Sequence, residues 1–175
     1  RDMMTSIIRK SEDPSLALDT RTASLHAATL THITPEARQA ARQEIADSYN
    51  TVTAKIKEIN AAAGENGLIL NGSTNGHLAT LTLSPQLLAK TGITNSEDLQ
   101  QYIYATTGIS THPLRMMGIT DPIVRINTTQ FTKNAGPVTE RLSQMVQEIS
   151  QSRGPRMEDV RQAFAALAQQ QGKNR

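Results

Sequence analysis

The sequence predicts a mainly α fold: a bundle of long amphipathic helices with a small β-hairpin or mixed region in the middle. Three observations predict it. Apolar residues recur at steps of three and four residues near both ends of the chain, which is the helical period. Short runs of strand-favouring residues lie between these ends. The chain has 175 residues, only 3% of them aromatic, and no Trp. A chain of this length can bury a core, and this core must be aliphatic, which favours close packing of helices.

The first predicted segment, residues 1–66, is helical. Short helices are expected at residues 3–10 and 15–32, and a long helix then starts at "ITPEAR", with Thr34 as its N-cap and Pro35 at its first position. Apolar residues follow at steps of three and four for nearly three heptads, as in the seam of a coiled coil. This seam consists of Ile45, Tyr49, Val52, Ile56, Ile59 and Ala63. Gly64 is expected to end the helix in a left-handed conformation.

The second predicted segment, residues 67–134, is a small mixed α/β region. "GLIL" and "HLATLTL" are expected to be the strands of a hairpin, because the Asn-Gly pairs of the connecting "NGSTNG" readily adopt the positive φ of tight turns. A further strand is expected at 122–131, "PIVRINTTQF", where apolar and polar residues alternate.

Two short helices are predicted inside this mixed region. "SPQLLAKTG" has Ser84 as its cap and Gly92 as its stop. "NSEDLQQYIYATTG" is capped by Asn95 or Ser96 and ends at Gly108. Side chains that accept hydrogen bonds favour helix starts, and glycine favours helix ends.

The third predicted segment, residues 135–175, returns to helix. Val138, Leu142, Met145 and Ile149 repeat the helical spacing, and "SRGPRM" then breaks it. A final amphipathic helix is expected to carry Met157, Val160, Phe164 and Leu167 on one face. These helices are predicted to pack back on the first segment, so that the three segments form a single domain.

The order of residues from 34 to 73 resembles the N-terminal rod of the flagellin family. Arg42, Tyr49, Ile56 and Ile59 occur in the family's order, "ENG" stands where the family has Phe-Asn-Gly, and "LILNGS" matches its Leu-Leu-Asn-Gly-Ser element. Glu65 replaces the family's Phe, so the aromatic anchor of that turn is missing. The resemblance implies a filament subunit, or a fragment of one, whose function is assembly.

An assembly or partner-binding seam is therefore predicted on the two heptad-patterned helices. Its members are Ile45, Tyr49, Val52, Ile56, Ile59, Val138, Leu142, Met145 and Ile149. The expected function is non-enzymatic protein–protein association in a bacterial protein exported through a type III pathway. The partner is a second copy of the chain, or a host or chaperone protein if the chain is a secreted effector or adaptor domain delivered into a host cell.

An enzymatic alternative rests on "HPLRMMGIT", which resembles the arginine loop of bacterial GTPase-activating effectors. Arg115 would then be the catalytic residue. Two features depart from that loop: His112 replaces its Gly, and the spacing from Arg115 to Thr120 is one residue too long. The alternative interpretation is an arginine on a surface loop whose methionines pack inward.

Composition excludes further classes of chemistry and partner. The chain has no Cys, which excludes disulfides, thiol catalysis and cysteine metal sites. Its histidines show no metal-binding spacing and are expected to be structural or at the surface; they are His26, His32, His77 and His112. The net charge is +2 with scattered Lys and Arg, and no long apolar run exists. We therefore expect no cofactor, no metal, no nucleic-acid partner and no membrane span.

Overall fold

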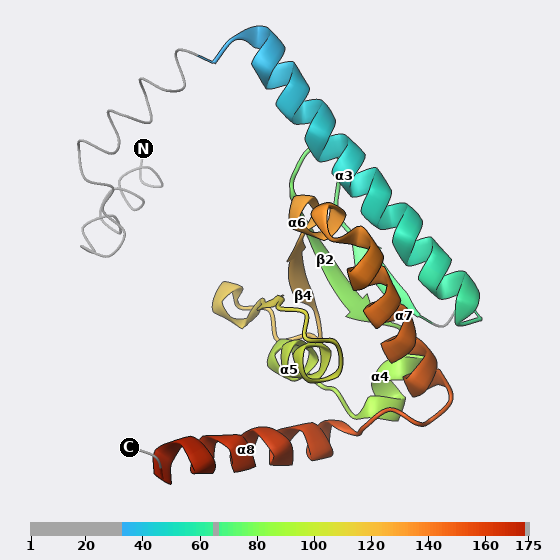
Figure 1. Ribbon diagram of the computed structural model, residues 1–175, viewed down its shortest axis with the longest axis vertical. Helices are drawn as coiled ribbons and strands as arrows, with labels where there is room; N and C mark the ends of the chain where they lie inside the picture. The colour runs from blue at the N-terminus through green and yellow to red at the C-terminus, as the bar shows by residue number, and fades with distance from the viewer. Residues whose placement is uncertain (1–32, 65–66, 174–175) are drawn as a thin grey trace. The chain divides into compact units, whose positions relative to one another are not determined.

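Figure 1 shows the computed structural model, which describes residues 33–64 and 67–173. This part of the chain is mostly helical and has a small four-stranded antiparallel sheet. In chain order the elements are α3 (Pro35–Ala62), β1 (Leu68–Asn71), β2 (Leu78–Leu83), α4 (Pro85–Thr91), α5 (Ser96–Thr107), β3 (His112–Pro113), the 3-10 helix η1 (Arg115–Met117), β4 (Val124–Asn127), α6 (Thr128–Lys133), α7 (Ala135–Ser150) and α8 (Met157–Lys173). The helices predicted at 3–10 and 15–32 lie outside the described residues.

The chain divides into two compact units, Arg1–Ala41 and Arg42–Arg175. In the first unit, the described residues hold the start of α3. Thr34 is its N-cap, since Thr34 Oγ1 accepts a hydrogen bond of 3.2 Å from the amide of Ala37. Pro35 is the first helical residue, as predicted. The rest of α3, from Arg42, and all later elements belong to the second unit.

The predicted helix boundaries of the second unit are confirmed where they depend on local signals. The side chains of Ser84 and Asn95 accept backbone hydrogen bonds in the first turns of α4 and α5. Gly92 and Gly108 end these helices with φ of 74° and 69°. Gly64 follows α3 with φ of 70°. These residues act on the turn next to them, so their effect can be read without knowing the fold.

The sheet has the strand order β1-β2-β4-β3, with every neighbouring pair antiparallel. The predicted hairpin is confirmed: β1 and β2 pair from Leu68 opposite Leu83 to Asn71 opposite Thr80. β4 then adds to the free side of β2, and the short β3 forms the other edge.

The connection between β1 and β2 differs from the prediction. No residue from Gly72 to Gly76 has a positive φ. The loop is long enough to reverse the chain with ordinary backbone angles, so its glycines are not needed for a left-handed turn. Gly72 serves a different purpose, because a Cβ there would lie 2.8 Å from Cε2 of Tyr49 and 3.0 Å from Cβ of Ala79.

The edge strand β1 is closed at its start by a side chain of α3. Asn60 Nδ2 donates to the carbonyl of Leu68, and Asn60 Oδ1 accepts from the amide of Leu68, both at 2.8 Å. The amide of Asn60 thus replaces one residue of a neighbouring strand. The site has room only for glycine at position 67, since a Cβ there would overlap Asn60 Oδ1.

The strand predicted at 122–131 is correct in its first half and wrong in its second. β4 covers Val124–Asn127, and α6 begins at Thr128. Asn127 Oδ1 accepts a hydrogen bond of 3.1 Å from the amide of Gln130. This cap starts a helix in a stretch whose composition alone favours a strand.

The hydrophobic core lies between one face of the sheet and the helices. From the sheet it takes Leu68, Ala79, Leu81, Leu83, Val124 and Ile126. From the helices it takes Val52, Ile56 and Ile59 of α3, Leu142, Met145, Val146 and Ile149 of α7, and further residues of α4, α5 and α8. Figure 1 shows α7 beside α3 on this side of the strands. A helix bundle is therefore not confirmed, because the apolar stripes of α3 and α7 meet a sheet as well as other helices.

The last helix, α8, packs against α5. Met157 and Val160 are buried, and Arg161 forms an ion pair of 2.7 Å with Asp98 of α5. The ring of Phe164 stacks on that of Tyr104, with centroids 6.5 Å apart. Among the described helices, none is both long enough and apolar enough to cross a membrane.

Candidate functional site

The face of the sheet opposite the helices carries a row of polar side chains. The strand registers place Asn71 opposite Thr80, Thr80 opposite Arg125, and Arg125 opposite His112. Because successive residues of a strand point to opposite faces, these four share one face, while Leu81, Val124 and Ile126 point to the core. We call this face the outer face.

A groove of about 470 Å³ lies on the outer face. Its wall is mostly apolar, with Arg125 as its charged member. The groove is lined by Asn71, Gly72, Leu78, Ala79, Thr80, Leu114, Met117, Ile119 and Arg125. Leu78 is 41% exposed and Met117 is 63% exposed, so large apolar side chains of the groove face solvent. We call it the outer-face groove.

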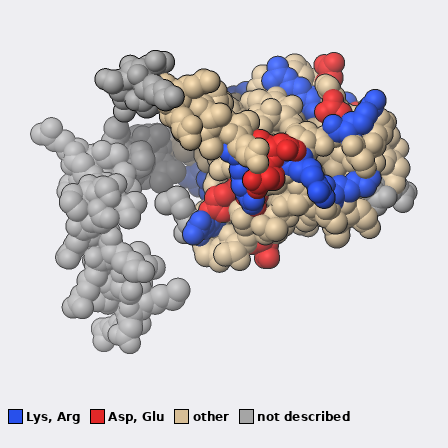
Figure 2. Space-filling model, turned by 90° about the horizontal axis from the view of Figure 1, so that it is seen from below, with Lys and Arg blue, Asp and Glu red and all other residues tan. Residues whose placement is uncertain are grey.

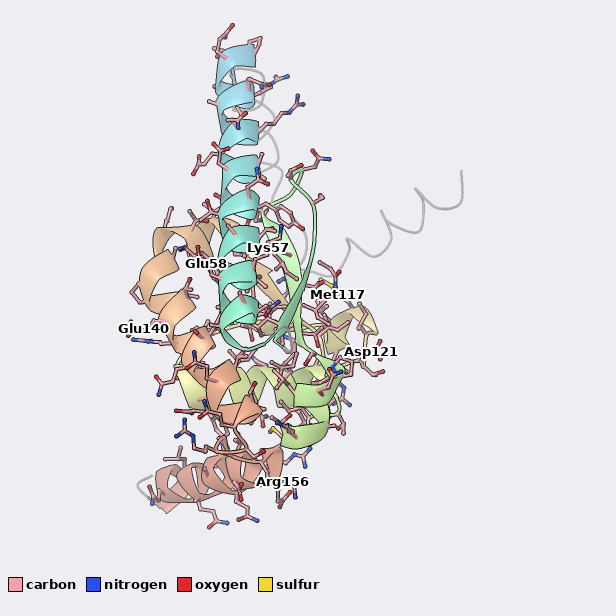
Figure 3. The ribbon with its side chains drawn as sticks, turned by 90° about the vertical axis from the view of Figure 1, so that its right-hand side faces the viewer. Lys57, Glu58, Met117, Asp121, Glu140 and Arg156 are labelled. Carbon is pink, nitrogen blue, oxygen red and sulfur yellow. The ribbon has the colours of Figure 1, made fainter. Side chains whose placement is uncertain are left out.

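One rim of the groove is the loop that follows β3. The amides of Met117 and Ile119 donate to the carbonyl of Leu114 at 2.9 and 3.3 Å, and Gly118 turns the chain with φ of 79°. Figure 3 shows Met117 and Asp121 on one side of the molecule, and Glu58 of α3 and Glu140 of α7 on the other. The loop therefore extends the outer face rather than the core.

The other rim lies at the end of β1, where Gly72 permits the ring of Tyr49 to approach. The same position borders Ala79 of β2. Tyr49 is thus partly covered by the hairpin, and any side chain at position 72 would push the two apart. The close approach fixes the end of β1 that borders the groove.

Arg125 has an unusual environment for a charged residue. Its Nε is buried and has no hydrogen-bond partner among the described residues. The four ion pairs found in the described part of the chain join Lys55 to Glu58, Arg115 to Glu97, and Arg161 to Asp98 and Glu158, so none involves Arg125. A buried donor without an acceptor lowers stability. Arg125 therefore has one unsatisfied donor beneath the groove, and its terminal nitrogens form no hydrogen bond or ion pair with the described residues.

The predicted seam has two environments in the structure. Six of its nine residues are buried in the core of the chain itself: Val52, Ile56, Ile59, Leu142, Met145 and Ile149. The other three are partly buried: Ile45, Tyr49 and Val138. The regular spacing therefore serves the packing of α3 and α7 within the chain. Its role toward another molecule stays a prediction.

Arg115, the candidate for a catalytic arginine, lies in η1 at the surface. Its side chain is 74% exposed, and its Nε is 3.5 Å from Oε1 of Glu97. Its neighbour Met117 points to solvent, so the expectation that this methionine packs inward is wrong. The loop curves back over the sheet through Leu114 and Ile119 instead.

The two described histidines lie on the sheet or next to it. His112 is exposed in β3, and the carbonyl of His77 accepts hydrogen bonds from the amide and hydroxyl of Thr128. His26 and His32 lie outside the described residues. Among residues 33–64 and 67–173, no group of three His, Cys, Asp or Glu side chains is placed to hold a metal ion.

Charged side chains of both signs alternate over the surface that Figure 2 presents. Basic residues on this face lie next to acidic ones. Such a surface has no single-sign field over this face. The groove is thus distinguished by its apolar lining and its single unpaired guanidinium.

No protein family, no curated protein and no solved structure gives a match to this chain.

Sequence reasoning did not find the outer-face groove. One signal was present: Arg125 stands between Val124 and Ile126 in a predicted strand, which places it on the opposite face from two core residues. Its neighbours on that face come from β2 and β3, and the pairing of those strands is not encoded near Arg125. The apolar rim comes from residues 114–119, which had been assigned to a surface loop.

Proposed function

We propose that this chain is a non-enzymatic binding module that associates with a partner protein through the outer-face groove. The observation that carries the proposal is the contiguous apolar lining, in which Leu78, Met117 and Ile119 remain exposed. Continuous apolar surface rimmed by polar groups is typical of interaction sites. A mostly apolar lining with few polar groups is also typical of ligand sites.

The proposal is tested by selecting from a displayed library of random heptapeptides against the immobilised chain. The variant Leu78→Ser removes apolar surface from the groove without adding charge. Ile69→Ser is the matched control, because Ile69 lies on the same face with nearly equal exposure, 42% against 41%, and does not line the groove. We expect enriched peptides that lose binding to Leu78→Ser and keep it with Ile69→Ser. No enrichment, or equal binding to the two variants, would overturn the proposal.

The proposed setting is a bacterial protein exported through a type III pathway, as an effector or adaptor domain. The absence of Cys and the small number of aromatic residues support this setting. A host or chaperone protein would then supply the segment that occupies the groove. Secretion of an epitope-tagged chain from strains with and without a functional type III apparatus tests the setting separately from the groove.

A second candidate function is self-assembly, as in a flagellin-like filament subunit. The surface that favours it is the apolar patch where α8 meets α5: Tyr104 and Leu167 are 54% and 53% exposed, and the ring of Phe164 stacks on that of Tyr104. Light scattering after size exclusion, over a wide concentration range, tests it with and without the residues from Ala163 onward. Growth in mass that disappears on truncation supports assembly. A constant monomer mass would remove this candidate.

The arginine-loop alternative has the least support. A catalytic arginine must reach a nucleotide's phosphates, whereas Arg115 is paired with Glu97 at the surface. The GTPase-activating proposal would require Glu97 to release it. Single-turnover GTP hydrolysis by a panel of small GTPases, with Arg115→Ala as the comparison, checks it directly.

A further inference from the structure

We propose that the segment bound by the outer-face groove carries a carboxylate that pairs with Arg125, next to apolar side chains that contact Leu78 and Met117. This inference rests on the proposed function and adds the chemistry of the ligand.

Arg125 is held at its position by the sheet. It lies in β4, an internal strand, and is paired with Thr80 on one side and His112 on the other. The flanking residues Val124 and Ile126 are buried in the core, so the backbone cannot shift the side chain away from the groove. The backbone of Arg125 is therefore held at the floor of the groove, and its side chain lines the groove.

The buried Nε of Arg125 lacks an acceptor within the described part of the chain. A guanidinium carries several N–H donors in a rigid planar fork, and this fork matches the two oxygens of a carboxylate. Because Nε is enclosed, a ligand carboxylate would pair with the terminal nitrogens of the fork, which form no hydrogen bond or ion pair with the described residues. An amide of equal size offers one acceptor oxygen and no charge, so the guanidinium binds it more weakly and favours an acid.

The charge of the groove favours a single negative charge on the ligand. Arg125 is the only charged member among the described residues that line it. One guanidinium balances one carboxylate, whereas a doubly charged phosphate would leave charge uncompensated against apolar walls. The neutral groups beside Arg125, Asn71 and Thr80, supply hydrogen bonds without changing this balance.

The shape of the site favours an extended peptide. Polar residues form a row across the strands, and exposed apolar residues lie on both sides of it: Leu78 on β2, and Met117 and Ile119 on the loop. Side chains of an extended chain alternate in direction, with about 7 Å between residues on one side. One acidic side chain over Arg125 can thus be accompanied by apolar neighbours over Leu78 and Met117.

The test uses the heptapeptides selected above and two charge variants of the full chain. Arg125→Gln removes the guanidinium from the groove. Arg156→Gln is the matched control, because it removes the same charge from an exposed residue next to α8, away from the groove (Figure 3). We expect the selected peptides to be enriched in Asp or Glu beside apolar residues. We also expect Arg125→Gln to weaken their binding about tenfold or more, and Arg156→Gln to change it less than about twofold.

The peptide is varied in the same experiment. Replacing its Glu by Gln should weaken binding to the original chain and have little further effect on Arg125→Gln, since the two changes remove the same contact. Enriched peptides that are apolar but not acidic, and that bind Arg125→Gln equally well, would overturn the carboxylate inference while leaving the groove proposal intact. If the selected peptides bind Leu78→Ser and Arg125→Gln as tightly as the original chain, both the groove proposal and the carboxylate inference are overturned. Saturable binding of decanoate, with no peptide enriched, would identify a small-molecule site and overturn the inference that the ligand is a peptide.

Discussion

The two faces of the β1-β2-β4-β3 sheet consist of the same strands and differ in what covers them. On the inner face, Leu81 and Val124 are opposite each other, and both are almost fully buried under the helices. On the outer face, Thr80 and Arg125 are opposite each other one residue along, and Leu78 nearby remains exposed. Leu114, Met117 and Ile119, from the segment around η1, line the groove on this face. One face is therefore buried in the core, and the other remains partly exposed to solvent.

The sharpest test of this comparison replaces a leucine by alanine on each face of β2 in turn. Leu81→Ala should lower the free energy of unfolding by about 2–5 kcal/mol, because it leaves a cavity in the core. Leu78→Ala, three residues away, should lower it by less than about 1 kcal/mol. Urea unfolding followed by circular dichroism measures both. Equal losses would show that the outer face is covered in solution.

A second prediction concerns the register of β1, which decides which of its side chains face the core. A slip of one residue in β1 would move Leu68 to the outer face and Ile69 to the inner one. Asn60 opposes this slip by binding both backbone groups of Leu68, and Gly67 leaves it room. Gly67→Ala should therefore cost about 1–3 kcal/mol of unfolding free energy.

The double variant Gly67→Ala with Asn60→Ala provides the control. It removes the overlap, so its cost should be close to that of Asn60→Ala alone and below the sum of the two single changes. Full additivity would show that Gly67 acts through its backbone and not through Asn60.

A third prediction uses the buried Tyr102 in the helical layer over the inner face. Its hydroxyl donates to the carbonyl of Pro155 at 3.0 Å. Burial, with a smaller contribution from the Glu148 carboxylate, raises the pKa of Tyr102 to about 12. Tyr102→Phe should cost about 1 kcal/mol at pH 8, since the hydrogen bond is lost.

The sign of the pH dependence follows from the neutral form being favoured in the fold. An unfolded Tyr has a pKa of about 10. The stability that Tyr102 contributes is therefore complete below about pH 10 and is lost as the pH rises through about 12. Between pH 8 and pH 11, the urea midpoint of unfolding should fall more for the original chain than for Tyr102→Phe. Parallel decreases would show that Tyr102 does not titrate in this range.

The smallest expected effect belongs to the outer face. Arg125→Leu should leave the free energy of unfolding within about 0.5 kcal/mol or raise it, because the change removes a buried donor that has no acceptor among the described residues. Urea unfolding compares it with Arg156→Leu at the surface. A loss above about 2 kcal/mol would show that Arg125 has a stabilising partner within the chain, and that its donors are not free for a ligand.

The two parts of the candidate site differ in how much the sequence revealed. The alternation of Val124, Arg125 and Ile126 indicates that Arg125 faces away from the core. The apolar rim from Leu114 to Ile119 carries no such signal, because a loop has no period. The heptad spacing on α3 was correctly assigned to a helix, whereas the surface that it meets could not be derived from it, since an apolar stripe packs equally well on helices or on a sheet.

By itself, the sequence determined the local elements: the helix starts at Thr34, Ser84 and Asn95, the helix ends at Gly92 and Gly108, and the hairpin of β1 and β2. The helix starts and ends depend on hydrogen bonds or backbone angles within a few residues, and the hairpin joins two strand-favouring runs that are close in the chain. The tertiary structure alone decided that β4 lies between β2 and β3, that helix follows strand after Asn127, and that Arg125 lies beside Thr80 and His112. Strand pairing joins segments far apart in the chain, and its register follows from the burial of a whole face at once.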